Sequence, residues 1–143
     1  HVDHLTITSI QRQAQAPEIL TCPDEATWEN ALQNAVASAR GQAGLTAIIV
    51  PFKHAAKRVQ AALGEDAPEL LPERGSLPES GVVLLTLKLA KGLEFDHVIV
   101  PDASERAFPD NDLARRRLYT TISRATRKLT VLADGQLTPL LDA

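Results

Sequence analysis

Short blocks of apolar residues alternate along the chain with segments that carry apolar residues at helical spacing. The compact apolar runs that predict strands lie at residues 17–22, 45–50, 82–87, 97–101 and 128–133. The segments that predict helices lie at residues 24–40, 54–63, about 112–126 and, as a short terminal helix, about 136–142. This alternation predicts an α/β fold of three layers, with helices on both faces of a mainly parallel sheet.

The middle of the chain departs from this regular pattern. Residues 65–81 hold three prolines and two glycines, which predict an irregular loop. The strands at 82–87 and 97–101 are separated by too few residues for a crossover helix of ordinary length. We therefore expect either a helix of one or two turns starting at Lys91 or an antiparallel pairing of the two strands.

The first helix has a start signal and an aromatic anchor. Thr21, with Pro23 and Asp24 after it, is typical of a helix N-terminus. Trp28 lies on the apolar face of this helix, where we expect a core residue rather than a platform for base stacking. Cys22 is expected to be a small buried side chain.

Length and composition are those of one ordinary domain. The 143 residues, 44% hydrophobic and 23% charged, suit a single packed domain over residues 1–143. The single cysteine excludes an intramolecular disulfide. No apolar run approaches the roughly 18 residues of a membrane helix and no leader is evident, so we expect a cytoplasmic protein without a membrane partner. Because the chain begins with His1 rather than Met, we expect a fragment of a longer protein.

Charge is distributed unevenly along the chain. The net charge of −3 argues against strong overall attraction to nucleic acid. Residues 115–128, however, hold six basic and no acidic side chains. Such a cluster fits either a solvated helix face or a local site for phosphate.

The segment Lys91-Gly92-Leu93-Glu94 places charged residues between two apolar strands. It is either an exposed turn or a nucleotide contact, in which the glycine amide meets a phosphate and the glutamate accepts from a sugar hydroxyl. Ligands of open parallel sheets bind beyond the carboxyl ends of the strands. We expect this segment and the arginine-rich helix to meet at that edge.

The helix at 112–126 is expected to bury one face and to present arginines on another. The buried positions would be Ala114, Leu118, Ile122 and Ala125. Arg117 and Arg124 are seven residues apart and would lie one above the other on the second face, with Tyr119 packed beneath. Arginine suits a grip on phosphoryl groups because its donors form a planar fork, although a solvent-facing stripe is the alternative.

Two long segments resemble signature motifs of UvrD/Rep-type superfamily 1 DNA helicases. "TLKLAKGLEFDHVIVPD" looks like the fifth motif and "RRRLYTTISRATRKLTVL" like the sixth, in the right order and at the right separation. "AFPDND" sits where this family often has a Phe-Pro pair. The match covers residues 82–133 and is similar to the helicase IV (HelD-like) branch. It implies the second, C-terminal RecA-like domain of a P-loop NTPase-type motor.

The resemblance implies a nucleotide-binding role for one group of residues. Arg124 would be the catalytic arginine that reaches the γ-phosphate across a domain cleft. Gly92 and Glu94 would approach the nucleotide, and Lys91 and Arg116 are assigned to the same group. Lys91 could serve either the nucleotide or DNA.

The resemblance implies that a second group contacts single-stranded DNA. Thr86 and Lys88 would face the strand, and Lys88 replaces the histidine that the family usually has there. Lysine can hold a phosphate but cannot stack on a base. Pro51 stands where a basic residue that contacts the nucleotide is expected, and Lys53 is a candidate substitute.

The cofactors implied by the family are ATP and Mg²⁺. No Gly-x-x-x-x-Gly-Lys-[Ser/Thr] phosphate loop occurs in these residues. ATP and Mg²⁺ would therefore be held mainly by an upstream RecA-like domain, and this chain alone is expected to be inactive. The histidines share no metal-ligand spacing, so we expect no metal site within the chain.

Three functions remain open from the sequence. The first is the C-terminal motor domain of an ATP-dependent DNA helicase or translocase, with single-stranded DNA and the upstream domain as partners. The second is the same domain in an ATPase that remodels RNA polymerase. The third is a degenerate module that binds DNA or protein without catalysis, which Pro51 and Lys88 favour.

Overall fold

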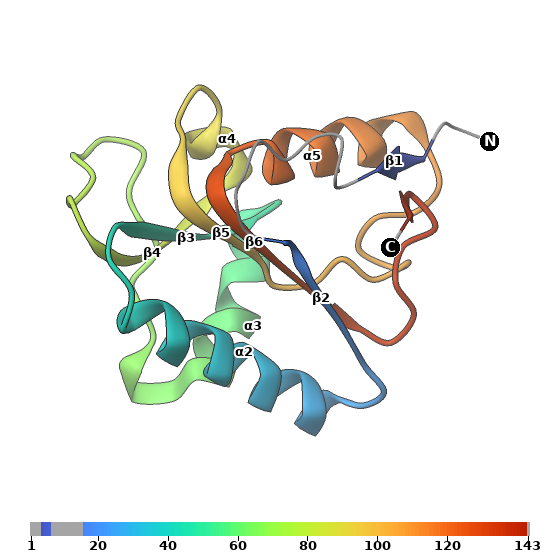
Figure 1. Ribbon diagram of the computed structural model, residues 1–143, viewed down its shortest axis with the longest axis horizontal. Helices are drawn as coiled ribbons and strands as arrows, with labels where there is room; N and C mark the ends of the chain where they lie inside the picture. The colour runs from blue at the N-terminus through green and yellow to red at the C-terminus, as the bar shows by residue number, and fades with distance from the viewer. Residues whose placement is uncertain (1–3, 7–15, 143) are drawn as a thin grey trace.

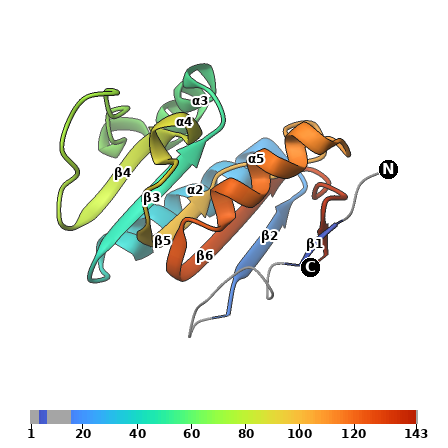
Figure 2. The ribbon, with the colours of Figure 1, turned by 90° about the horizontal axis from the view of Figure 1, so that it is seen from above.

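A five-stranded parallel sheet forms the centre of the computed structural model, which describes residues 4–6 and 16–142 (Figure 1). The strands follow the order β2-β6-β5-β3-β4 across the sheet (Figure 2). Their bounds are β2 Glu18–Cys22, β3 Leu45–Val50, β4 Gly81–Thr86, β5 Phe95–Val100 and β6 Ala125–Asp134. Every pairing in this sheet is parallel, which confirms the predicted α/β fold.

Helices cover both faces of the sheet. The helices are α2 Glu25–Arg40, α3 Lys53–Leu63, α4 Leu87–Ala90 and α5 Asp112–Ile122. α2 and α3 lie on one face, and α4 and α5 lie on the other (Figure 1). No helix among the described residues has the length and apolar character needed to cross a membrane.

The core consists of two apolar clusters, one on each face of the sheet. All of β3 is buried, and its side chains alternate between the clusters, with Ile48 facing α2 and α3 and Ile49 facing α4 and α5. Trp28 is 1% exposed, so its predicted role as a core residue is confirmed. Cys22 is also buried as predicted, and burial raises the pKa of its thiol.

The N-cap of the first helix lies three residues after Thr21, the residue that the sequence signal indicated. Asp24, not Thr21, is the N-cap, and its carboxylate accepts a hydrogen bond of 2.8 Å from the backbone N–H of Thr27. Thr21 cannot cap the helix because it belongs to β2, where it pairs with Ala133.

The arginine-rich helix ends earlier than predicted. α5 stops at Ile122, and Ser123 is its C-cap. The carbonyl oxygen of Arg124 accepts from the N–H of Phe95 at 2.8 Å, and β6 begins with the next residue. Pairing with β5 therefore ends the helix, and the prediction that Arg117 and Arg124 stack on one helix face is wrong.

The short connection between β4 and β5 is a parallel crossover. Thr86 caps α4, and its hydroxyl accepts from the N–H of Leu89 at 3.4 Å. The predicted short helix exists, but it starts at Leu87 rather than Lys91. β4 and β5 lie on opposite sides of β3, so the alternative of an antiparallel pairing is wrong.

Residues 136–142 do not form the predicted terminal helix. Leu137 makes an antiparallel bridge to Ser104, and β7 (Leu141–Asp142) pairs with β1 (Leu5–Thr6). The backbone N–H of Thr138 donates to the carbonyl oxygen of Ala103 at 2.9 Å. These long-range bonds use the backbone groups that a helix would need.

The irregular segment 65–81 protects an edge of the sheet. A 3-10 helix, η1 (Gly64–Asp66), opens it, and β4 begins at its last residue. The N–H of Leu71 donates to the carbonyl oxygen of Leu84 at 2.8 Å, so the segment covers the outer side of edge strand β4. Covering an edge in this way blocks pairing with other chains.

Candidate functional site

The charged segment between β4 and β5 runs from the carboxyl ends of the parallel strands to their amino ends. These two sides of the sheet are called the carboxyl edge and the amino edge. Thr86 ends β4 at the carboxyl edge, whereas Glu94 directly precedes β5 at the amino edge. Arg124 directly precedes β6 and lies at the same amino edge. The predicted meeting at the carboxyl edge holds for Lys91, which lines a cavity there with Arg116 and Arg117 of α5, whereas Arg124 contacts Leu93 at the amino edge.

Three hydrogen bonds anchor the Arg124 side chain at the amino edge. Its Nε donates to the carbonyl oxygen of Thr120 at 3.0 Å, and its Nη1 donates to that of Leu93 at 3.3 Å. Nη2 donates to the hydroxyl of Ser123 at 3.3 Å. These bonds fix the plane of the half-buried guanidinium, which carries further N–H donors for a ligand.

Gly92 and Glu94 flank Leu93, the residue that Arg124 contacts. Gly92 has φ +82°, and a Cβ at this position would meet nothing within 4 Å. The backbone here is therefore open to a ligand, and the conformation is one that glycine adopts without strain. Glu94 is exposed at the same edge.

Thr86 and Lys88 lie at the carboxyl edge, opposite Arg124. The Lys88 side chain is 83% exposed, and its Nζ lies 3.8 Å from Oε1 of Glu73, also an exposed side chain. Such an exposed ion pair contributes little and is readily exchanged for another anion.

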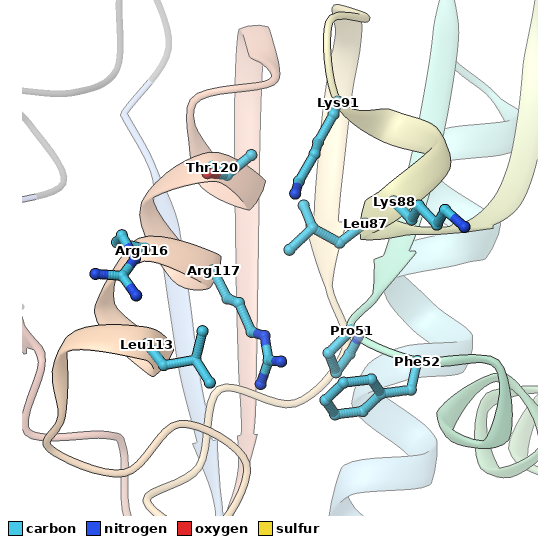
Figure 3. A pocket seen from close by; sticks show the side chains of 9 residues that line it. All are labelled: Pro51, Phe52, Leu87, Lys88, Lys91, Leu113, Arg116, Arg117 and Thr120. Carbon is cyan, nitrogen blue, oxygen red and sulfur yellow. The ribbon is translucent and has the colours of Figure 1, made fainter.

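A cavity of about 470 Å³ opens beside Lys88, between α4 and α5 (Figure 3). It is lined by Pro51, Phe52, Leu87, Lys88, Lys91, Leu113, Arg116, Arg117 and Thr120. Figure 3 shows Lys91 reaching down into it from the end of α4. The lining combines four cationic side chains with apolar ones and includes no carboxylate.

The cavity changes the grouping of the predicted nucleotide-binding residues. The structure brings Gly92, Glu94 and Arg124 together at the amino edge. It places Lys91 and Arg116 on the cavity with Lys88 instead. Both are therefore candidates for contacts to the same ligand as Lys88.

Phe52 and His54 are aromatic members of the carboxyl edge that sequence reasoning did not single out as site residues. Phe52 is 40% exposed, and its ring stacks on that of His54 with centroids 5.3 Å apart and 10° between the planes. The guanidinium carbon of Arg117 lies 4.8 Å from the Phe52 ring centroid. The sequence signal that could have identified Phe52 is an apolar residue that directly follows a buried strand and a proline.

Two further predictions concern the surroundings of these edges. Tyr119 is 47% exposed, so the prediction that it packs beneath the arginine face is wrong. Pro51 lies at the carboxyl end of β3, on the edge opposite Arg124. Its lack of charge therefore does not alter the amino edge, and Lys53 is an exposed residue at the start of α3.

A network around Arg58 fixes the carboxyl edge. Its guanidinium carbon lies 3.9 Å from the ring centroid of Trp28, and its nitrogens pair with Asp102 at 3.4 Å and with Asp134. The indole N–H of Trp28 donates to the carbonyl oxygen of Pro101 at 2.7 Å. Oδ1 of Asp102 also accepts from the N–H of Asp134 at 3.0 Å. These contacts join α2, α3, β5 and β6 into a rigid edge.

His97 lines a second cavity, of about 260 Å³, at the amino edge. Its Nε2 lies 2.8 Å from the hydroxyl of Thr130, and Nδ1 has no hydrogen-bond partner within the described part of the chain. Burial, and then the charge of Lys128, lower the pKa of His97 to about 4. The imidazole is therefore neutral near pH 7.

The described residues contain no cluster of three or more His, Cys, Asp or Glu side chains placed to hold a metal ion. The amino edge presents an arginine fork, an open glycine backbone and a carboxylate. This donor set suits a triphosphate and a sugar hydroxyl.

Comparisons with known proteins give the same fold and a family. The model of the UvrD-like helicase C-terminal domain matches residues 81–132. The crystal structure of the C-terminal domain of a possible DNA helicase from Lactobacillus plantarum WCFS1 is 30% identical, with a TM-score of 0.79, over 94% of this chain and 84% of that one.

More distant structures share the fold alone. The C-terminal domain of the DEAD-box protein Dbp5 is 19% identical, with a TM-score of 0.55, over 89% of this chain and 79% of that one. The PRRSV nsp10 helicase is 17% identical, with a TM-score of 0.52, over 90% of this chain and 27% of that one. No curated protein matches the chain. On the match to the Lactobacillus domain, this chain belongs to the family of UvrD-like helicase C-terminal domains.

Proposed function

We propose that the chain is the C-terminal motor domain of an ATP-dependent DNA helicase or translocase. It would complete an ATP cleft with an upstream RecA-like domain and contact single-stranded DNA. One observation carries this proposal: Arg124 is anchored on Leu93 at the amino edge, while Thr86 and Lys88 lie at the opposite edge. Nucleotide and DNA would thus contact opposite edges of one sheet.

The amino edge provides the nucleotide contacts in this proposal. ATP, when bound, supplies the phosphoryl group whose transfer drives the motor. Arg124 would donate to phosphate oxygens with the N–H groups that its internal bonds leave available, and its fixed plane reduces the cost of ordering it. Glu94 would accept from a ribose hydroxyl, and the open backbone at Gly92 would approach a phosphate. Mg²⁺ would be held mainly by the upstream domain.

The segment 87–94 would couple the two edges. It starts at the carboxyl edge, where Thr86 caps α4, and ends at the amino edge, where Arg124 bonds to Leu93. Any movement of Arg124 toward a phosphate changes its bond to Leu93 and thus the position of this segment. A shift between open and closed arrangements of the motor would reach Lys88 by this route.

Within the family, we place the chain nearest the helicase IV (HelD-like) branch. The support is the form of its sixth motif, which reads Tyr-Thr-x-x-Ser-Arg-Ala over residues 119–125. Phe95 and Asp96 after the fifth motif are further support.

The test is ATP hydrolysis by the intact protein with and without single-stranded DNA. We expect hydrolysis that single-stranded DNA stimulates, together with unwinding or translocation on a labelled strand. Absence of ATP hydrolysis under both conditions would overturn the proposal. Stimulation by RNA polymerase but not by DNA would instead support the polymerase-remodelling ATPase.

A further inference from the structure

Phe52 is a large apolar side chain exposed at the carboxyl edge, where the fold itself does not require it. It is the N-cap of α3, with φ −143° and ψ 159°, and makes no side-chain capping bond. Ser, Thr, Asp and Asn are the residues that stabilise this position. The extended backbone after Pro51 directs the ring outward over the edge, toward the cavity of Figure 3.

The ring is part of a row of three planar groups. His54 stacks on it at 5.3 Å and nearly parallel, and the guanidinium of Arg117 lies 4.8 Å from its centroid. These groups come from two elements, the start of α3 and the middle of α5. Flat aromatic and guanidinium surfaces of this kind are those on which unpaired bases stack.

The charged side chains that line the cavity beside this row are all cationic. Lys88, Lys91, Arg116 and Arg117 line the cavity, and no carboxylate does. Its volume of about 470 Å³ is suited to a small-molecule unit such as one nucleotide. A ligand with a flat apolar part and an anionic part satisfies both halves of this lining.

We propose that Phe52 is a base-stacking residue for single-stranded DNA at the carboxyl edge. One base would stack on the Phe52 ring in place of the Arg117 guanidinium, and the phosphates beside it would contact Lys88, Lys91 and Arg116. The inference rests on the proposed function in assigning this edge to DNA, and it adds the residue that supplies the non-ionic part of the affinity. It also gives this edge a stacking group that Lys88 cannot provide. Double-stranded DNA lacks an unpaired base and would bind less well.

The test is equilibrium binding of a short oligonucleotide to the intact protein over a range of salt concentrations. Phe52→Leu is expected to weaken binding about 5- to 100-fold, the usual effect of removing one base-stacking side chain, with no change in salt slope. Lys88→Ala is expected to reduce the slope of log affinity against log salt by about 0.7, the value for one phosphate contact on a single strand. Phe52→Tyr should retain tight binding.

A fluorescent purine analogue in the oligonucleotide reports stacking directly. Its quenching on binding should be lost in Phe52→Leu and kept in Lys88→Ala at saturating protein. Tyr119→Leu is the matched control, because Tyr119 is as exposed as Phe52 but lies outside the cavity. Because Phe52 makes no capping bond and is exposed, the free energy of unfolding of Phe52→Leu should lie within about 0.5 kcal/mol of that of the parent protein.

The outcomes separate the inference from the proposed function. If Lys88→Ala weakens binding and Phe52→Leu does not, stacking on Phe52 is refuted. The assignment of the carboxyl edge to DNA would still be supported. If Phe52→Leu changes the salt slope as Lys88→Ala does, Phe52 acts only by arranging the cations and the inference fails. If the protein binds no single-stranded DNA, the proposed function itself fails.

Discussion

The guanidinium of Arg124 donates a hydrogen bond of 3.3 Å to the carbonyl oxygen of Leu93, a residue 31 positions earlier in the chain. The bond joins the two segments that resemble helicase motifs at one point of the amino edge. It is reinforced by the backbone bond from Phe95 to the carbonyl oxygen of Arg124, at 2.8 Å. The position of Arg124 is thus set by both motifs together.

Replacing Arg124 should abolish catalysis without preventing ATP binding. In Arg124→Ala, we expect ATP turnover by the intact protein to fall about a thousandfold or more, the usual effect of losing an arginine at the transferring phosphoryl group. ATP binding, measured by titration, should change little because, in the proposed function, Gly92, Glu94 and the upstream domain would still contact the nucleotide. Arg124→Lys should also be impaired, since an ammonium group cannot form the planar fork.

Arg74→Ala is the matched control for this experiment, because Arg74 is exposed in the segment that covers β4. Its turnover should equal that of the parent protein. Undiminished turnover in Arg124→Ala, in a protein with unchanged thermal stability, would show that Arg124 is not the catalytic arginine.

Gly44 should be far less tolerant of a side chain than other glycines with positive φ. A Cβ on Gly44 would lie 2.5 Å from Oδ2 of Asp96, the atom that accepts the N–H of Leu45 at 2.8 Å. Gly44→Ala must therefore displace a carboxylate as well as adopt φ +91°. We expect it to lower the free energy of unfolding by more than about 2 kcal/mol, measured by urea denaturation.

Gly135→Ala isolates the backbone part of this effect. Gly135 has φ +97°, but an added Cβ would meet nothing within 4 Å. Gly135→Ala should lower the free energy of unfolding by about 1 kcal/mol. Equal losses in the two variants would show that the contact with Asp96 is unimportant.

Trp28 should contribute to stability through its indole N–H as well as its volume. In Trp28→Phe, the carbonyl oxygen of Pro101 loses its 2.7 Å hydrogen bond and Arg58 loses part of the surface on which it stacks. We expect a loss of about 2–3 kcal/mol in the free energy of unfolding, measured by urea denaturation. The exposed Tyr119 provides the comparison: Tyr119→Phe should change stability by less than about 0.5 kcal/mol. A similar small effect in Trp28→Phe would contradict this account.

His97 should make the protein less stable in mild acid. Its pKa is about 4 in the folded protein, lowered mainly by burial, against 6.5 in the unfolded chain. Between these values the unfolded state binds a proton that the folded state does not. Stability due to His97 is therefore full above about pH 6.5 and falls as the pH drops toward 4, by roughly 3 kcal/mol in total.

His97→Gln should flatten this part of the pH profile, because glutamine can still bond to Thr130 but does not titrate. The measurement is the urea midpoint between pH 4 and 7. A steep profile that persists in His97→Gln would assign the acid sensitivity to other groups.

The residues of the candidate site could be predicted better than their positions. The motifs allow Thr86, Lys88, Gly92, Glu94 and Arg124 to be proposed as contacts, because these strings of residues are specific. Their division between two edges could not be predicted, since it depends on how the crossover at 87–94 runs. Phe52 was not proposed as a site residue because only the folded structure shows its ring exposed beside Arg117 and the cavity.

The sequence by itself determined the α/β class, most of the helices and strands, and the resemblance of two segments to helicase motifs. These follow from apolar periodicity, capping residues and local strings, all of which act over a few neighbouring residues. The tertiary structure alone decided the strand order, the end of α5 at Ile122, the absence of a terminal helix and the edge at which each charged group lies. Each of these depends on backbone pairing between residues far apart in the chain, and local sequence signals carry no information about such pairing.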